Sequence, residues 1–164
     1  MSWVAIMMGS ESDWQVMENS VDVLKSLQLD YEVRILSAHR TPQATASYVE
    51  EAGERGCAVF ICGAGLAAHL AGSVAAHTLC PVIGVPLDSG GLGGMDALLA
   101  TVQMPGGIPV ATVAIGKAGA KNAAYLAAQI LAGSDPEIRE RLAAQRADNA
   151  NKVGAQNDAL QKHI

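Results

Sequence analysis

The sequence predicts an α/β fold, in which a parallel β-sheet lies between two layers of helices. Short runs of apolar, often β-branched residues alternate with longer segments whose apolar residues recur at helical spacing. Hydrophobic residues make up 50% of the 164 residues and charged residues only 16%, which fits one domain over 1–164 with a sizeable core. Strand–helix alternation requires right-handed crossovers, and these put helices on both faces of the sheet.

The first predicted strand, residues 4–8, is a continuous apolar run that ends at Gly9-Ser10. A helix over about 13–27 follows, because its apolar side chains recur every three or four residues. Residues 31–36 form the second strand. Thr41-Pro42 then starts a second helix, since threonine is favoured before the first turn and proline within it, and this helix ends near Gly56.

The alternation continues in the second half of the chain. Residues 58–62 form the third strand, and we expect Gly63-Ala64-Gly65 to turn the chain into a helix that runs through His77. The next elements follow in order: strand 81–86, glycine-rich loop 90–94, helix 96–102, strand 110–115 and helix 119–131. Ser134-Asp135-Pro136 begins a final charged helix that reaches about Asp148 or beyond, so the last helix and tail occupy about 135–164.

Composition excludes several classes of function. A net charge of −5 and only one Phe, two Trp and three Tyr argue against a nucleic-acid partner, which calls for basic patches and stacking platforms. Residues 56–87 lack charge, but glycines and prolines interrupt them, so we expect buried elements and no membrane span. The three cysteines form no C-x-x-C pair or even disulfide set, and the N-terminus shows no secretory signal. These features favour a cytoplasmic protein.

Charge is distributed unevenly along the chain. The last 30 residues hold 10 of the 27 charged side chains, which leaves 17 for the first 134 residues. Alanine- and valine-rich stretches at 67–76 and 118–132 lack a polar face, so we expect helices buried on more than one side. A monomer would be left with a weakly apolar surface, and we therefore expect a homo-oligomer.

Ligands in such sheets bind at the carboxyl ends of the strands, so the loops after residues 8, 36, 62, 85 and 115 are the candidate site. The first loop contains Ser10, Ser12 and Asp13 at a helix N-terminus, where hydroxyls and free N–H groups suit an anion. Asp13 would repel a phosphate. It either accepts hydrogen bonds from sugar hydroxyls or caps the helix.

The second loop, residues 37–42, places His39 beside Arg40. Histidine has an ordinary pKa of about 6.5 and can act as acid and base in one cycle, while arginine offers a planar fork for phosphate. The third loop, Gly63 to Leu70, supplies small residues against which a flat ligand could lie. It does not complete a G-x-G-x-x-G fingerprint, so no dinucleotide cofactor is expected. The role of His69 is open, and the histidine spacing predicts no metal site.

Five blocks together resemble the class I N5-carboxyaminoimidazole ribonucleotide mutases of de novo purine synthesis. The blocks are Met8 to Asp13, Ser37 to Pro42, Gly63 to Leu70, Pro81 to Pro86 and Val102 to Val110, within a match over about 3–142. The resemblance implies a flavodoxin-like three-layer α/β/α fold, an octamer, and an isomerase that moves a carboxylate from the exocyclic nitrogen to C4 of the ribonucleotide without metal, nucleotide or biotin.

The resemblance also implies roles for particular residues. His39 would be the catalytic proton carrier, and Ser10, Asp13 and Arg40 would bind the ribose 5′-phosphate portion. Ser12 and Ser37 would add hydroxyl donors. The third loop would line the imidazole and carboxylate pocket, through Gly63, Ala64, Gly65, Leu66, Ala67, His69 and Leu70.

Two positions depart from the family pattern, because Leu66 and Ala71 stand where the family often has Gly and Pro. Leu66 narrows the pocket or shifts the loop. A sister class that carboxylates aminoimidazole ribonucleotide directly tends to have Lys at position 40 and Gly-Arg-Ser at 63–65, so Arg40 and Gly63-Ala64-Gly65 favour the mutase. The direct carboxylase and a non-catalytic nucleotide-binding module are the alternatives.

Overall fold

The computed structural model describes residues 2–164, and its five strands form one parallel sheet. The strands are β1 (Trp3–Met8), β2 (Tyr31–Ile35), β3 (Cys57–Gly65), β4 (Val82–Leu87) and β5 (Ala111–Thr112), in the order β2-β1-β3-β4-β5. The chain leaves β1 for β2 and returns past β1 to β3, so the sheet changes its direction of growth between β1 and β3. This is the flavodoxin-like topology, and the predicted fold class is confirmed.

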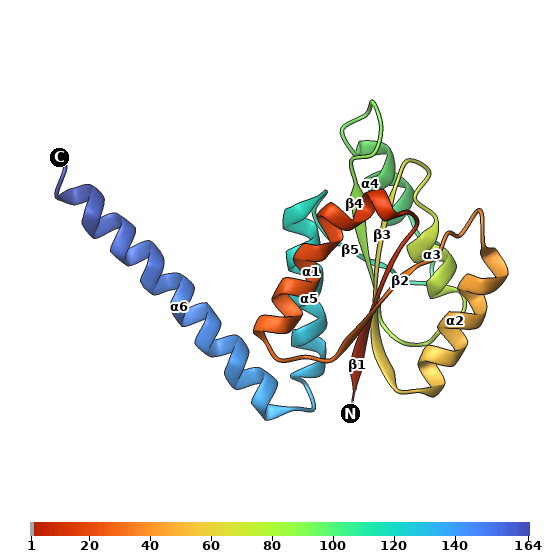
Figure 1. The fold of residues 1–164 in the computed structure, drawn as a ribbon, viewed down its shortest axis with the longest axis horizontal. Coiled ribbons are helices and arrows are strands. Elements are labelled where there is room, and N and C mark those ends of the chain that lie inside the picture. Colours follow the sequence, from red (N-terminus) through yellow and green to blue (C-terminus); the bar gives the residue numbers. More distant parts are fainter. Residues whose placement is uncertain (1) are drawn as a thin grey trace.

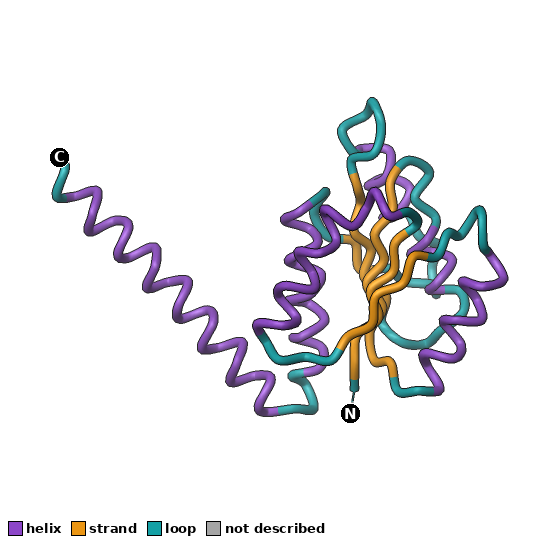
Figure 2. Tube along the Cα trace, in the orientation of Figure 1, coloured by secondary structure: helices purple, strands orange, loops and turns teal. Residues whose placement is uncertain are grey.

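Helices cover both faces of the sheet, as Figures 1 and 2 show. A short 3-10 turn, η1 (Glu11–Asp13), leads into α1. The helices are α1 (Trp14–Ser26), α2 (Pro42–Glu54), α3 (Leu70–Ala75), α4 (Met95–Val102), α5 (Lys117–Leu131) and α6 (Pro136–Gln161). Alternate β1 residues point to opposite faces. Val4, Ile6 and Met8 pack with α1 and α5, while Ala5 and Met7 pack with α2 and α3.

The third strand is longer than predicted. The expected turn at Gly63-Ala64-Gly65 is wrong, because these residues continue β3 and pair with Val85, Pro86 and Leu87 of β4. Glycine at Gly63 leaves room for Met17, because an added Cβ would collide with the outer atoms of the Met17 side chain unless that side chain moved. The third helix accordingly starts later, at Leu70, and ends before His77.

Two further predictions need correction. The fifth strand has only two residues instead of six. Beyond Thr112 the chain runs beside β4 but makes only isolated backbone hydrogen bonds to it, from Val113 N to Gly84 O (3.1 Å) and from Gly116 N to Pro86 O (2.9 Å). Helix α5 is buried along one side and exposes residues such as Lys121 on the other, so it is not buried on more than one side.

Helix α6 projects away from the body of the molecule (Figure 1). Its start matches the prediction, since the Asp135 carboxylate accepts from Glu137 N (2.9 Å) and Ile138 N (3.4 Å), with Pro136 in the first turn. Ile138 is buried, and Gln145 Nε2 donates to Ser26 Oγ (3.0 Å). The remainder of α6 is largely exposed. Across residues 2–164, no helix has the combination of length and apolar character that crossing a membrane requires.

Candidate active site

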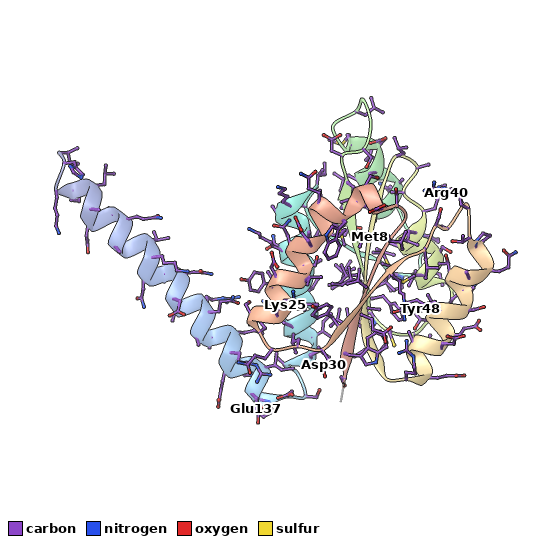
Figure 3. All side chains as sticks on the ribbon, viewed as in Figure 1. Met8, Lys25, Asp30, Arg40, Tyr48 and Glu137 are labelled. Carbon is purple, nitrogen blue, oxygen red and sulfur yellow. The ribbon has the colours of Figure 1, made fainter. Side chains whose placement is uncertain are left out.

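A cavity of about 610 Å³ lies at the carboxyl ends of β1, β2 and β3, beside the point where the sheet changes direction. Figure 3 marks this end of the molecule by Met8, the last residue of β1, and by Arg40. Every predicted site residue except Gly63 lines the cavity: Ser10, Ser12, Asp13, Ser37, His39, Arg40, Ala64, Gly65, Leu66, Ala67, His69 and Leu70. Gly63 lies one position deeper, buried in β3 under Met17.

The loop after β1 is held by Asp13. Ser10 N donates to Asp13 Oδ2 (3.1 Å), and Ser12 N donates to Ser10 Oγ (3.4 Å). Asp13 therefore completes a capping box with Ser10 at the start of η1, whereas at the start of α1 its side chain makes no capping hydrogen bond. Burial raises its pKa, although the N–H groups of Ser10 and Gly9 and the charge of Arg40 act in the opposite direction. Ser12 is exposed, so its hydroxyl is accessible to a ligand.

The loop after β2 is fixed by its own side chains. Ser37 N donates to Thr41 Oγ1 (2.9 Å), and Arg40 N donates to Ser37 Oγ (3.1 Å). The Arg40 guanidinium reaches across to the first loop, where Nη2 donates to the Gly9 carbonyl (3.0 Å). This contact ties the two loops together and leaves an exposed cation next to the serine hydroxyls, an arrangement suited to a phosphate.

The two histidines of the site are in direct contact. His39 Nε2 lies 2.6 Å from His69 Nδ1, and the rings meet edge to face, with centroids 4.8 Å apart and an interplanar angle of 87°. At this distance one ring nitrogen can donate a hydrogen bond to the other, and the tautomer of each ring decides which of them donates. The sequence left the role of His69 open, because the two residues are 30 positions apart.

The cavity has three lining residues that the sequence did not predict: Gly9, Ala38 and Ser89. Ser89 follows β4 and packs against Gly65, where an added Cβ would collide with the Ser89 hydroxyl. The signal that could have identified it is its place after a predicted strand, directly before the glycine-rich loop. The loop after β5 was also expected at the site, but none of its residues lines the cavity.

The chemistry of the cavity is divided between its two ends. Serine hydroxyls and Arg40 can bind an anionic group, while the His39–His69 pair can give or take a proton at a neighbouring group. Among residues 2–164, no three His, Cys, Asp or Glu side chains are grouped so that they could hold a metal ion. The arrangement fits proton transfer on a small phosphorylated ligand.

The chain is similar to known proteins over nearly its whole length. The family model described as AIR carboxylase matches residues 3–152. A relative from Bacillus subtilis (strain 168), named N5-carboxyaminoimidazole ribonucleotide mutase, is 52% identical over 157 residues, which are 96% of this chain and 97% of the relative.

The mutase of the same name from Escherichia coli (strain K12) is 55% identical over 139 residues, or 85% of this chain and 82% of the relative. Among solved structures, the crystal structure of Treponema denticola PurE superposes with a TM-score of 0.88 at 32% identity. That match covers 98% of this chain and 99% of the other.

Proposed function

The chain belongs to the AIR carboxylase family, and from this premise we propose that it is an isomerase that converts N5-carboxyaminoimidazole ribonucleotide to 4-carboxy-5-aminoimidazole ribonucleotide in de novo IMP synthesis. Relatives that are 52% and 55% identical over most of the chain carry the name of this mutase. The observation that carries the mechanism is the meeting of the His39–His69 pair with the serine and arginine loops in one cavity.

We assign the phosphate to the end of the cavity formed by the first two loops. Ser10, Ser12 and Ser37 supply hydroxyl groups, and Arg40 supplies the positive charge. The Asp13 carboxylate already accepts a hydrogen bond from Ser10 N, so it holds the first loop in the conformation that binds the phosphate. Its position beside the cavity also suits a hydrogen bond from a ribose hydroxyl.

The base and its carboxylate then lie against the third loop, from Ala64 to Leu70, within reach of His39. Protonated His39 gives a proton to the exocyclic nitrogen as the bond from that nitrogen to the carboxylate carbon breaks and CO₂ is released. C4 of the neutral aminoimidazole attacks CO₂. Neutral His39 removes the proton from C4, which restores aromaticity and returns the enzyme to its first state.

His69 supports this cycle through its contact with His39. Because His69 Nδ1 lies 2.6 Å from His39 Nε2, it limits the orientation of the imidazole and can accept or return a hydrogen bond as the charge on His39 changes. An additional contact between His69 and the substrate carboxylate is consistent with its place in the cavity wall.

Direct carboxylation of aminoimidazole ribonucleotide is the second candidate, because the family description names that reaction. Two parallel reactions separate the candidates. One contains N5-carboxyaminoimidazole ribonucleotide without bicarbonate, and the other contains aminoimidazole ribonucleotide with bicarbonate. Rapid formation of the C4-carboxylated product only in the first reaction is the expected result. Efficient turnover in the second would establish the carboxylase, and no product in either would favour the binding module.

We also propose that the protein is a cytoplasmic homo-octamer that needs no cofactor. The octamer follows from the family resemblance, and exposed apolar side chains such as Leu79, Leu92 and Leu99 support self-association. Cys57, Cys62 and Cys80 are free thiols, which suits a reducing compartment. The partner on which the enzyme acts is a small ribonucleotide.

A further inference from the structure

Leu66 has a backbone conformation that leucine rarely adopts. Its φ is +56°, and it lies at the point where β3 ends and the third loop begins. A left-handed conformation costs a residue with a Cβ roughly 1–2 kcal/mol, and such strain is concentrated at functional sites. Glycine would fit without this cost. We therefore expect the Leu66 side chain to make a contact that compensates for the strain of its backbone.

The Leu66 side chain packs on the glycine-rich loop that follows β4. An added Cβ at Gly90 would lie only 2.7 Å from Leu66 Cδ2, so the side chain rests directly on the Gly90 backbone. Each of these residues is preceded by one that also takes part in the contact, because Gly65 packs against Ser89. The third loop and the glycine-rich loop thus touch at two successive positions on the wall of the cavity.

The environment of this contact is otherwise polar and accessible. Leu66 is 54% exposed although it lines the cavity, and Ser89 and Gly90 are exposed beside it. Gly93 and Gly94 have φ values of +61° and +79°, which any other residue would adopt only with strain. The contact with the third loop is made at Ser89 and Gly90, and Leu66 supplies the apolar surface on which Gly90 rests.

We propose that Leu66 seals the active-site cavity against solvent and retains CO₂ between its release from nitrogen and its attack by C4. This inference rests on the proposed mutase function. CO₂ is small, uncharged and apolar, so hydroxyl and imidazole groups hold it weakly. An apolar side chain in the cavity wall hinders the exit of CO₂ and the entry of water that would compete for the cavity. Leu66 is a sealing residue and takes no part in proton transfer.

Isotope retention tests the proposal. Unlabelled N5-carboxyaminoimidazole ribonucleotide reacts with excess enzyme for a single turnover in ¹³C-bicarbonate and carbonic anhydrase, with an enzyme-free blank subtracted. The native chain is expected to give product with the original ¹²C carboxylate. Leu66→Gly is expected to incorporate at least several-fold more ¹³C and to release free aminoimidazole ribonucleotide. Mass spectrometry measures both.

Three controls keep the result specific. Leu66→Gly relieves the left-handed strain, so its melting temperature is not expected to fall. Leu66→Met, which keeps an apolar side chain, is expected to restore retention. Leu92→Gly removes an exposed leucine from the same glycine-rich loop, but Leu92 does not line the cavity, so its retention is expected to match the native chain.

Several outcomes would overturn the proposal. Equal ¹³C incorporation in the native chain and Leu66→Gly would show that Leu66 does not retain CO₂, as would complete exchange in the native chain. A Leu66→Gly variant that forms neither product nor free aminoimidazole ribonucleotide would also contradict it. If the native chain itself forms no C4-carboxylated product, the proposed function fails, and that result is distinct from a change in retention.

Discussion

His39 is the side chain on which the proposed reaction depends. Asparagine can neither carry nor release the imidazole proton, so His39→Asn is expected to reduce kcat by about 100- to 10,000-fold. Arg40 and the serine hydroxyls remain, so binding of aminoimidazole ribonucleotide is expected to persist. Product formation measures kcat, and isothermal titration calorimetry measures Kd.

The matched control for this variant is His77→Asn. His77 is exposed, and its Nδ1 lies 2.8 Å from the Ser73 carbonyl, outside the active-site cavity. Its replacement is expected to leave kcat unchanged. Full activity in His39→Asn would eliminate His39 as the proton carrier, and lost binding without a change in turnover of bound substrate would make it a binding residue.

Asp13 links the function of the site to the stability of the fold. Because burial raises its pKa, the native state binds more protons than the unfolded state between the unfolded and folded pKa values. The stability that this difference contributes is present below the unfolded pKa and is lost as pH rises through the folded value. Burial of the ionised carboxylate therefore lowers the stability of the fold at neutral pH.

Asp13→Asn is therefore expected to raise the free energy of unfolding above that of the native chain, and this gain is expected to be largest at neutral pH. Its advantage should shrink as the pH falls towards about 4, near the ordinary pKa of aspartate. Urea unfolding at one protein concentration and several pH values measures the difference. A difference that grows on acidification would contradict the assignment.

Comparison of the predicted with the observed helices and strands shows which features a local sequence pattern can predict. Apolar runs and periodicity predicted the five strands in their order along the chain, because those signals are local, although the fifth strand is shorter than predicted. They did not show that β3 continues through Gly65, since that depends on pairing with Leu87, 22 positions away. The contact between His39 and His69 was missed for the same reason, and so was the place of Ser89 in the cavity wall.

Gly119 lets the first turn of α5 pack closely against the segment that joins β5 to α5. An added Cβ at this position would collide with the backbone carbonyl of Ala114, which cannot move as a flexible side chain would. Gly119→Ala is expected to lower the free energy of unfolding by about 3 kcal/mol, the upper end of the cost of overpacking. Chemical denaturation at fixed protein concentration measures this change.

Gly154 in α6 provides the matched control. An added Cβ there meets no atom within 4 Å, and the residue is exposed in a helix. Gly154→Ala is expected to leave stability unchanged or to raise it by about 0.5–1 kcal/mol, because alanine favours the helix. A similar loss in both variants would show that the Ala114 contact is not responsible.

The molecule as a whole exposes more apolar surface than a stable monomer needs. On α4, Met95, Leu99 and Val102 recur at helical spacing and are 52%, 54% and 45% exposed. Leu79 is fully exposed at the opposite end of the sheet, beside a cavity of about 840 Å³ that includes Ile108. Helix α6 extends from the body with most of its length unpacked. These features support the proposed self-association, in which copies of the chain would cover these apolar side chains.

The exposed face of α4 allows the assembly to be tested by a single charge. Leu99→Asp places a carboxylate at the middle of the apolar stripe, where contact with another copy would bury it at a cost of several kcal/mol. The variant is expected to fold but to elute from size exclusion with light scattering as a smaller species than the native chain. Ser47→Asp adds the same charge to an exposed position of α2 and is expected to leave the assembly intact. If Leu99→Asp has the native mass, α4 lies outside the interfaces, and a monomeric native chain would contradict the proposed assembly itself.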